Sequence, residues 1–166
     1  MLRAAARTAP VELDVVEHAL DDVPLYNFDV EQQGDPPGVA RLKAAIAGAD
    51  GVLVVTPEYQ HGVPGVLKNA LDWVSRPPGR SALQDKPAVV MGASPGMTGT
   101  ARAQSQLRQV LTYNACRVLP PPEVLIARAA EKVHDGEFTD ETSLEFITGA
   151  MSRFADWVAA YGPART

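Results

Sequence analysis

The chain has 166 residues, the length of one ordinary domain with one sizeable core, so we expect a single domain over residues 1–166. Its formal net charge of −5 argues against nucleic acid and an anionic membrane surface as partners, because both favour a basic face. A single cysteine, Cys116, excludes an intramolecular disulfide, fits a reducing cytoplasm, and lies in an apolar stretch where we expect an inert thiol. No apolar run approaches the roughly 20 residues that span a bilayer, so no membrane partner is expected.

Segments typical of strands and of helices alternate along the first half of the chain. Residues 2–7 are typical of the end of a helix, and the alternation of apolar residues over 11–18 predicts a strand with one buried face. A loop rich in turn-forming residues leads to a short helix over 39–47, introduced by prolines that suit a first turn. The continuous apolar run 51–55, GVLVV, is typical of a parallel strand that is covered on both faces.

The second half of the chain continues this alternation. A helix that begins at Pro64 is expected to have one apolar face, formed by Val66, Leu67, Ala70, Leu71 and Val74. It is followed by a buried strand over 87–92, a helix over 99–113, and a last strand in two pieces, 116–119 and 123–126, on either side of three prolines.

The last helix is expected to begin after Thr139, whose side chain suits a cap, with Asp140 and Glu141 in the first turn. Apolar residues then recur at spacings of three and four, which predicts packing against a sheet rather than a role in binding a cofactor. This stripe consists of Leu144, Ile147, Met151, Phe154, Val158 and Tyr161.

Strands that alternate with helices predict a three-layer α/β fold with a parallel sheet. Such folds bind ligands at the carboxyl ends of their strands, so the loops after Val55 and Gly92 are the candidate sites. The first loop reads TPEYQHGVPG: its prolines stiffen the backbone, and its glycines let the backbone approach a ligand closely. These features suit a flat ring with polar edges, and an ordinary connection between strand and helix is the alternative that the residues leave open.

The stretch PEYQHGVPGVLKNALDWVSRP, residues 57–77, resembles the flavin-binding signature of the NADPH-dependent FMN reductase family, which includes quinone, chromate and azo-dye reductases. The family's form is PEYN, a short variable stretch, and then PGxLKNAIDWxSRP. The resemblance implies a flavodoxin-like fold, FMN as cofactor and NAD(P)H as reductant. It implies that the isoalloxazine ring is contacted by Pro57, Glu58, Tyr59 and Gln60. Gln60 replaces the family's Asn, which places its amide one methylene further out.

Four residues of the helix that follows this loop belong to the same signature. The resemblance implies that they serve helix packing and dimer contacts rather than catalysis. These residues are Lys68, Asn69, Asp72 and Trp73.

The loop after the second buried strand, GASPG at 92–96, has two interpretations. It matches the G-x-S-x-G turn of serine esterases, which would make Ser94 a nucleophile. Against this, Pro95 lacks the backbone N–H that an oxyanion hole needs, and the one downstream histidine, His134, lies in a polar turn. The family resemblance instead implies a flavin loop, in which Ala93 and Ser94 contact the pyrimidine side of the ring.

The family begins with a strand and a GSxRxxSxN-like loop that holds the FMN phosphate, and this sequence contains neither. In the flavodoxin-like strand order 2-1-3-4-5 the missing first strand is central. Segments 11–18 and 51–55 would then have to pair directly or leave a gap, and unpaired buried backbone is costly. Two explanations are open: the true start lies upstream of Met1, or the chain is a truncated protein that binds FMN poorly.

The resemblance therefore implies an NAD(P)H-dependent FMN oxidoreductase that works by ping-pong hydride transfer. NAD(P)H would reduce FMN, nicotinamide would leave, and a small acceptor such as a quinone would enter the same cleft. A cytoplasmic homodimer or homotetramer is implied as well. The alternatives are a non-enzymatic flavodoxin-like electron carrier, which would lack the long PGVLKNALDW stretch, and a truncated apo protein. No metal site is expected, because the three histidines are scattered rather than at ligand spacing.

Overall fold

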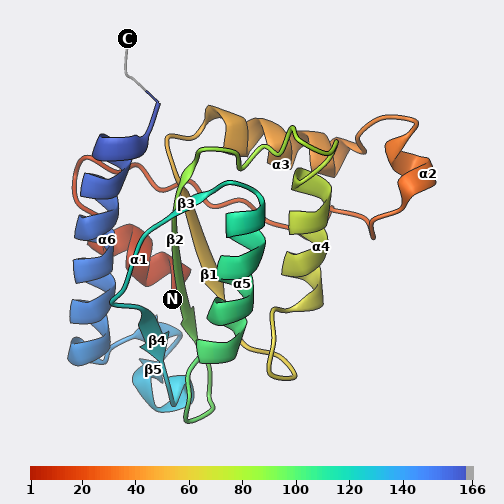
Figure 1. The fold of residues 1–166 in the computed structure, drawn as a ribbon. Coiled ribbons are helices and arrows are strands. Elements are labelled where there is room, and N and C mark those ends of the chain that lie inside the picture. The colour runs from red at the N-terminus through yellow and green to blue at the C-terminus, as the bar shows by residue number, and fades with distance from the viewer. Residues whose placement is uncertain (164–166) are drawn as a thin grey trace.

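The computed structural model describes residues 1–163, which form an α/β fold with a parallel sheet between two layers of helices (Figure 1). The helices are α1 (Leu2–Thr8), α2 (Phe28–Glu31), α3 (Pro37–Gly48), α4 (Gly65–Val74), α5 (Ala101–Tyr113) and α6 (Glu141–Tyr161), with a 3-10 helix at Ala129–Lys132. The strands are β1 (Val52–Thr56), β2 (Pro87–Ala93), β3 (Arg117–Val118), β4 (Val124–Ile126), β5 (Val133–His134) and β6 (Glu137–Phe138).

The strand β2 is the centre of the main sheet and runs parallel to each of its neighbours. It pairs with β1 in a register that aligns Val52 with Ala88 and Thr56 with Gly92. It also pairs with β3 near its start and with β4 near its end, so these two strands are pieces of one interrupted strand. The parallel sheet and the last strand in two pieces, both predicted from the sequence, are confirmed.

Helices cover both faces of this sheet. The helices α1 and α6 lie together on one face, whereas α4 and α5 lie on the other, with α3 beside α4 (Figure 1). Side chains of β2 alternate between two cores: Val89 and Met91 belong to the core under α6, and Ala88 and Val90 belong to the core under α4 and α5. The three-layer α/β architecture predicted from the alternation of elements is therefore confirmed.

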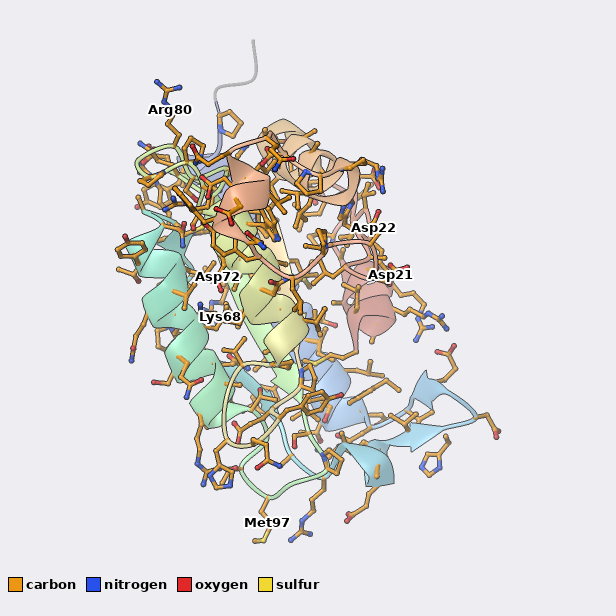
Figure 2. All side chains as sticks on the ribbon, turned by 90° about the vertical axis from the view of Figure 1, so that its right-hand side faces the viewer. Asp21, Asp22, Lys68, Asp72, Arg80 and Met97 are labelled. Atoms are coloured by element: carbon orange, nitrogen blue, oxygen red, sulfur yellow. The ribbon has the colours of Figure 1, made fainter. Side chains whose placement is uncertain are left out.

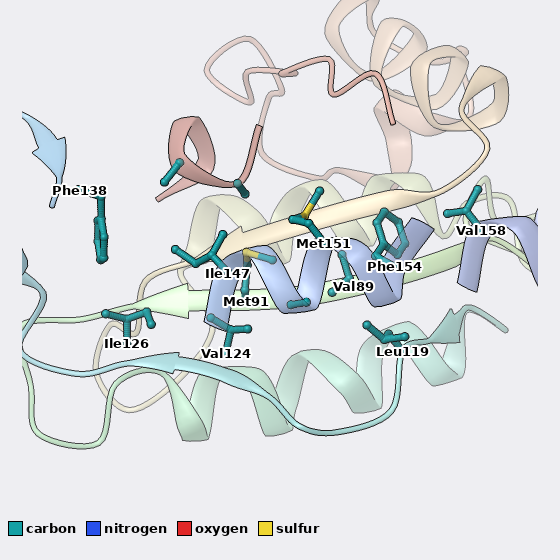
Figure 3. Close-up of a cluster of buried hydrophobic side chains, with 13 residues drawn as sticks. Val89, Met91, Leu119, Val124, Ile126, Phe138, Ile147, Met151, Phe154 and Val158 are labelled. Carbon is teal, nitrogen blue, oxygen red and sulfur yellow. The ribbon is translucent and has the colours of Figure 1, made fainter. Parts of the chain in front are cut away.

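Most of the apolar stripe predicted on α6 is buried against β2 and β4 (Figure 3). Its buried members are Ile147, Met151, Phe154 and Val158. Tyr161 departs from the stripe, because it is 43% exposed and its ring lies against that of Trp157 with 4.3 Å between centroids. The cap predicted at Thr139 is wrong: Asp140 caps the helix, because its carboxylate accepts a hydrogen bond from the Ser143 amide at 2.9 Å.

The strand predicted over residues 11–18 is wrong. This segment has no regular structure, and within the described residues β1 is paired only with β2. A strand needs a neighbour that completes its ladder of hydrogen bonds, and no described segment provides one here. Leu13 and Val15 nevertheless pack against the core under α6, whereas Val11 and Val16 are 97% and 81% exposed. Two of the three alternating residues thus reach the core without forming a strand, and Val11 does not.

Three smaller differences concern the helices. The apolar face of α4 is rotated from the predicted one, because Val66 is 54% exposed and Trp73 is fully buried. The helix α5 begins at Ala101 rather than Gly99, whose φ of 58° lies outside the right-handed helical region. The short helix α2 lies within a segment expected to be a loop. None of the helices in the described part of the chain is long and apolar enough to cross a bilayer.

Candidate active site

Two loops leave the sheet side by side, from the carboxyl ends of β1 and β2. The strand register pairs Thr56 with Gly92, so Pro57 and Ala93 come next at adjacent strand ends. Both loops lie at the same edge of the sheet, which is the lower edge in Figure 1. The fold therefore brings together the two segments that the sequence marks as candidate sites, as expected for the carboxyl edge of a parallel sheet.

The first loop closes in a tight two-residue turn. Tyr59 and Gly62 exchange backbone hydrogen bonds of 3.1 and 3.0 Å. The residues between them, Gln60 and His61, have φ values of 49° and 62°. Positive φ at both central positions is type I′ geometry, which Asn and Gly adopt more readily than Gln and His do. The ring of Tyr59 is 64% exposed, so it is available as a wall for a flat ligand.

The side chain of Glu58 points toward α5. Its Oε2 accepts hydrogen bonds from the backbone amides of Arg102 and Ala103 at 3.0 and 3.1 Å, and its Oε1 accepts one from the Arg102 guanidinium at 3.1 Å. Burial acts to raise the pKa of Glu58, but the hydrogen bonds from Ala103 and Arg102 outweigh it and hold this pKa below its usual value. The carboxylate therefore stays ionised and caps the first turn of α5.

A second contact with α5 holds the other end of this loop. The Oε1 atom of Gln106 accepts a hydrogen bond from the Val63 amide at 3.1 Å. A Cβ atom on Gly62 would lie 2.8 Å from the same oxygen, so glycine leaves the room that the Gln106 side chain needs. Because Glu58 and Gln106 hold the loop at both ends, its backbone is ordered before any ligand arrives.

The second loop is held mainly by backbone hydrogen bonds. The Ser94 amide donates to the Ile126 carbonyl, and the Ala129 amide donates to the Ser94 carbonyl, both at 3.0 Å. The Ser94 hydroxyl accepts from the Gly96 amide at 3.2 Å, and no hydrogen bond among the described residues joins Ser94 to a histidine. A serine nucleophile needs an adjacent base, so this geometry does not support the esterase interpretation. The tip of the loop carries Met97, which is 80% exposed (Figure 2).

A buried polar layer lies between the start of α5 and the sheet. Gln104 is fully buried, and its Nε2 donates to Thr100 Oγ1 at 2.9 Å and to the Val124 carbonyl at 2.8 Å. A Cβ atom on Gly92 would lie 2.2 Å from Thr100 Oγ1 and 2.4 Å from the Thr56 carbonyl oxygen. Only glycine therefore allows the start of α5 to sit this close to the strand ends from which both loops leave.

The two loops fit the ring of a flavin. The amides of Glu58 and Gln60 donate to no acceptor among the described residues, so they are free to bond the polar edge of a ring. Pro57 is exposed and rigid, and Ala93 and Ser94 lie at the neighbouring strand end. The sequence contains no loop of the GSxRxxSxN type, so the described residues include no candidate for the phosphate site typical of the family.

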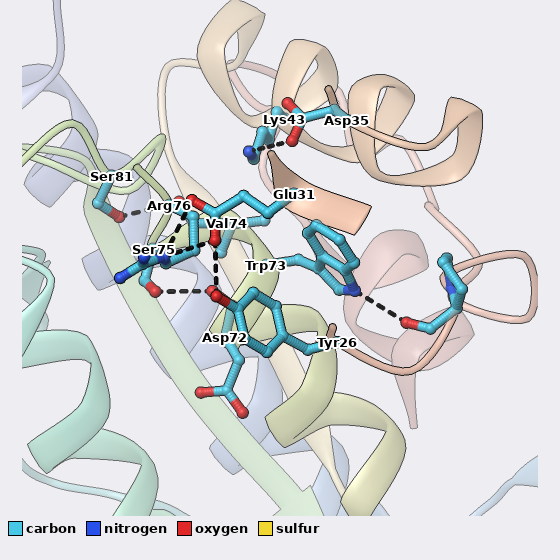
Figure 4. A network of polar contacts seen from close by, with 11 residues as sticks. Tyr26, Glu31, Asp35, Lys43, Asp72, Trp73, Val74, Ser75, Arg76 and Ser81 are labelled. Atoms are coloured by element: carbon cyan, nitrogen blue, oxygen red, sulfur yellow. Dashed lines mark hydrogen bonds and ion pairs between the residues drawn. The ribbon is translucent and has the colours of Figure 1, made fainter. Parts of the chain in front are cut away.

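Signature residues on α4 hold a neighbouring segment of the chain rather than facing the two loops. The Asn69 side chain accepts from the Tyr26 amide at 2.8 Å and donates to the Pro24 carbonyl at 2.9 Å. The Trp73 indole donates to the same carbonyl at 2.8 Å, and its ring meets that of Tyr26 edge-on (Figure 4). This geometry agrees with the packing role expected for Trp73, which is fully buried, whereas Asn69 binds an irregular segment rather than a helix. Lys68 and Asp72 form an exposed ion pair of 2.6 Å one turn apart (Figure 2).

The same segment is tied to the end of α4 by an ion pair that the sequence does not signal. Glu31 accepts from the Tyr26 hydroxyl at 2.6 Å and from Arg76 Nε at 2.9 Å (Figure 4). The hydrogen bond from Tyr26, together with Arg76, lowers the pKa of Glu31 below its usual value. No periodicity or motif joins these three residues, so only the tertiary structure reveals the contact.

Other reactive side chains do not add to this site. Burial raises the pKa of the Cys116 thiol to about 12, and its Sγ donates to the Leu83 carbonyl at 3.3 Å. The thiol is therefore protonated, in agreement with the inert role expected for it. Within residues 1–163, no group of three or more His, Cys, Asp or Glu side chains is placed to hold a metal ion.

Comparison with known proteins identifies the family of this chain. A family model described as NADPH-dependent FMN reductase matches residues 1–131. An NAD(P)H-dependent FMN reductase of Pseudomonas aeruginosa is 40% identical over 95% of this chain and 85% of that protein. A quinone reductase of Escherichia coli is 39% identical over 94% of this chain and 85% of its own length. The solved structure of FerB, a flavoenzyme NAD(P)H:(acceptor) oxidoreductase from Paracoccus denitrificans, superposes with a TM-score of 0.87 at 36% identity, covering 98% of this chain and 89% of that one.

The fold and the paired loops define a flavodoxin-like flavoenzyme, and the chain belongs to the NADPH-dependent FMN reductase family. It is accordingly an oxidoreductase that uses FMN as its cofactor and NAD(P)H as its reductant. The resemblance inferred from PEYQHGVPGVLKNALDWVSRP is confirmed.

Proposed function

We propose that the loops after β1 and β2 together form the site for the FMN ring, and that the enzyme passes electrons from NAD(P)H to quinone-like acceptors in a ping-pong sequence. The observation that carries this proposal is that Pro57 and Ala93 lie at adjacent strand ends, and that α5 holds the loop that begins at Pro57. The quinone reductase of Escherichia coli among the relatives supports a quinone as acceptor.

Each residue of the site has a distinct part in this proposal. FMN, when bound, supplies the chemistry that takes a hydride from NAD(P)H and passes electrons to an acceptor. The free amides of Glu58 and Gln60 would bond the polar edge of the ring, and Ala93 and Ser94 would lie beside it on the side of β2. The exposed ring of Tyr59 forms a wall of the cleft, against which a nicotinamide and then a quinone stack. Since both substrates use this one cleft, they occupy it in turn.

We also propose that the enzyme is a homodimer or homotetramer in the cytoplasm. A cavity of about 330 Å³ lies between α4 and α5, and its lining includes Tyr113, which is 87% exposed. An exposed aromatic beside a cavity is typical of a protein interface, which supports assembly through this face. Light scattering of the purified protein should give the mass of two or four chains, whereas the mass of one chain at micromolar concentration would contradict the proposal.

The test of the ring site is a spectroscopic titration of the purified chain with FMN and, separately, with riboflavin, which lacks the phosphate. Both flavins should bind, NAD(P)H should bleach the bound FMN, and benzoquinone should restore its colour. Initial rates should be measured against NAD(P)H concentration at several fixed quinone concentrations. The double-reciprocal plots should then give parallel lines. A chain that binds neither flavin would overturn the proposed site, and intersecting lines would overturn the ping-pong sequence.

The proposed wall of the cleft can be tested with Tyr59→Ala. Loss of stacking should raise KM for the quinone about fivefold while flavin remains bound, since an aromatic contact is worth about 1 kcal/mol. The matched control is Tyr161→Ala, which removes an exposed aromatic from the far end of α6 and should leave KM unchanged. Equal KM values for Tyr59→Ala and the wild type would show that Tyr59 does not shape the acceptor site.

A further inference from the structure

The side chain of Glu58 connects two segments that are far apart in the sequence. It lies in the loop after β1 yet is only 7% exposed, because its carboxylate reaches the first turn of α5. Thr100, the residue at the cap position of α5, makes no capping hydrogen bond with its own side chain. The amides of Arg102 and Ala103 instead donate to Glu58, 44 and 45 residues away. The cap of this helix is thus supplied by the neighbouring loop.

The second loop begins at Ser94 and leads directly into the first turn of α5. The Glu58 carboxylate therefore bonds the one loop directly to the base of the other. Between Glu58 and the contact at Gln106 lies the turn whose central residues, Gln60 and His61, have positive φ without being glycine. Such a conformation costs free energy and persists only where the surroundings hold it. Glu58 is one of the two side chains that hold this turn.

We propose that Glu58 is a positioning residue, whose carboxylate sets the separation of the two flavin loops by capping α5 from the first loop. Its backbone amide remains available to the ring, whereas its side chain acts through α5. This inference rests on the ring site proposed above. It also has an electrostatic consequence, because the carboxylate offsets the positive end of the α5 dipole beside the site.

The test measures riboflavin affinity, because riboflavin reports on the ring loops without the phosphate. Glu58→Ala should weaken binding roughly fivefold, which is the factor that corresponds to the loss of one ordinary helix cap. Glu58→Gln keeps an acceptor for the two amides, so its affinity should lie between those of Glu58→Ala and the wild type. With FMN bound, Glu58→Gln should also shift the midpoint potential in the positive direction, because a negative charge beside the site is lost.

The matched control is Asp140→Ala. Asp140 caps α6 through the Ser143 amide at 2.9 Å and pairs with Lys132 at 3.3 Å, so it makes the same kinds of contact as Glu58 but bonds no residue of the two loops. Both alanine variants should lower the melting temperature, and only Glu58→Ala should weaken riboflavin binding. In hydrogen exchange, Glu58→Ala should speed exchange over residues 57–63 as well as at the start of α5.

The outcomes separate this inference from the proposed function. If the wild type binds riboflavin and Glu58→Ala binds it equally well, the positioning role is wrong while the ring site stands. If Glu58→Ala and Asp140→Ala weaken binding alike, the effect is one of general stability, and the positioning role is again wrong. A wild type that binds no riboflavin overturns the ring site and this inference together.

Discussion

Both faces of the sheet rest on an apolar core, and they differ in the segments that their directional hydrogen bonds hold. On the α6 face, apolar side chains such as Met151 pack against β2 and β4, and Trp157 donates a hydrogen bond to a carbonyl of β3, which is a strand of the sheet itself. On the α4 face, Trp73 and Asn69 add directional hydrogen bonds to the segment around Pro24. Apolar packing depends on the area that is buried and builds a layer, whereas hydrogen bonds depend on direction and fix a loop in one position. The α4 face can therefore place a segment that has little regular structure of its own.

The largest effect is expected from Trp73→Ala on the α4 face. This change removes a fully buried ring and a hydrogen bond to the Pro24 carbonyl, so the free energy of unfolding should fall by about 3–5 kcal/mol. Urea denaturation measures the change. Trp73→Phe keeps most of the apolar contact and should cost clearly less. A decrease of less than about 1 kcal/mol in the free energy of unfolding of Trp73→Ala would contradict this expectation, since the α4 face would then not depend on this residue.

On the α6 face, Met151→Ala is expected to cost about 2–4 kcal/mol, because the fully buried side chain leaves a cavity between α6 and the sheet. The volume-conserving change Met151→Leu should cost less than about 1.5 kcal/mol. Urea denaturation measures the free energy change of both variants. Hydrogen exchange shows which segment of the chain each substitution loosens. Residues 24–31 should exchange faster in Trp73→Ala than in Met151→Ala, and equal rates would contradict the different roles of the two faces.

A smaller loss is expected from Asn69→Ala. The Asn69 side chain makes two hydrogen bonds to the segment at Pro24 and Tyr26, so its removal should cost about 1–2 kcal/mol. Lys68→Ala, one residue earlier on α4, removes an exposed ion pair and should cost no more than about 0.5 kcal/mol. Urea midpoints of the two variants measure the difference. Equal midpoints would show that directional bonds do not hold this segment.

The smallest effect is the pH dependence that comes from Glu31. Its pKa is lowered in the folded protein, first by the hydrogen bond from Tyr26 and further by Arg76 and Lys43. A lowered pKa means that the stabilisation is fully present above the unfolded value, near 4.3, and is lost as the pH falls through the lower folded value. The urea midpoint of the wild type should therefore fall more steeply below about pH 4.5 than that of Glu31→Gln. Parallel curves would exclude Glu31 as the source.

Much of the fold follows from patterns that are local in the sequence. The run GVLVV predicts β1 because a strand covered on both faces needs apolar residues throughout, and the stripe on α6 predicts a helix because its period matches the helical turn. The segment 11–18 shows the limit of this reasoning. Its apolar alternation is genuine, but a strand also needs a paired neighbour, which the residues of the segment cannot supply.

The candidate site also has features that the sequence predicts and features that only the tertiary structure reveals. The sequence by itself determined the class of protein, the parallel α/β fold, and the two loops that carry the candidate flavin contacts. Only the tertiary structure decided that the Glu58 carboxylate caps α5 and that Asp140 rather than Thr139 caps α6. It also decided that Trp73 and Asn69 form hydrogen bonds with the segment at Pro24. The physical reason is that periodicity and signatures are properties of neighbouring residues. The partner of a polar side chain is set by the packing of elements that can be more than forty residues apart, as Glu58 and Ala103 are.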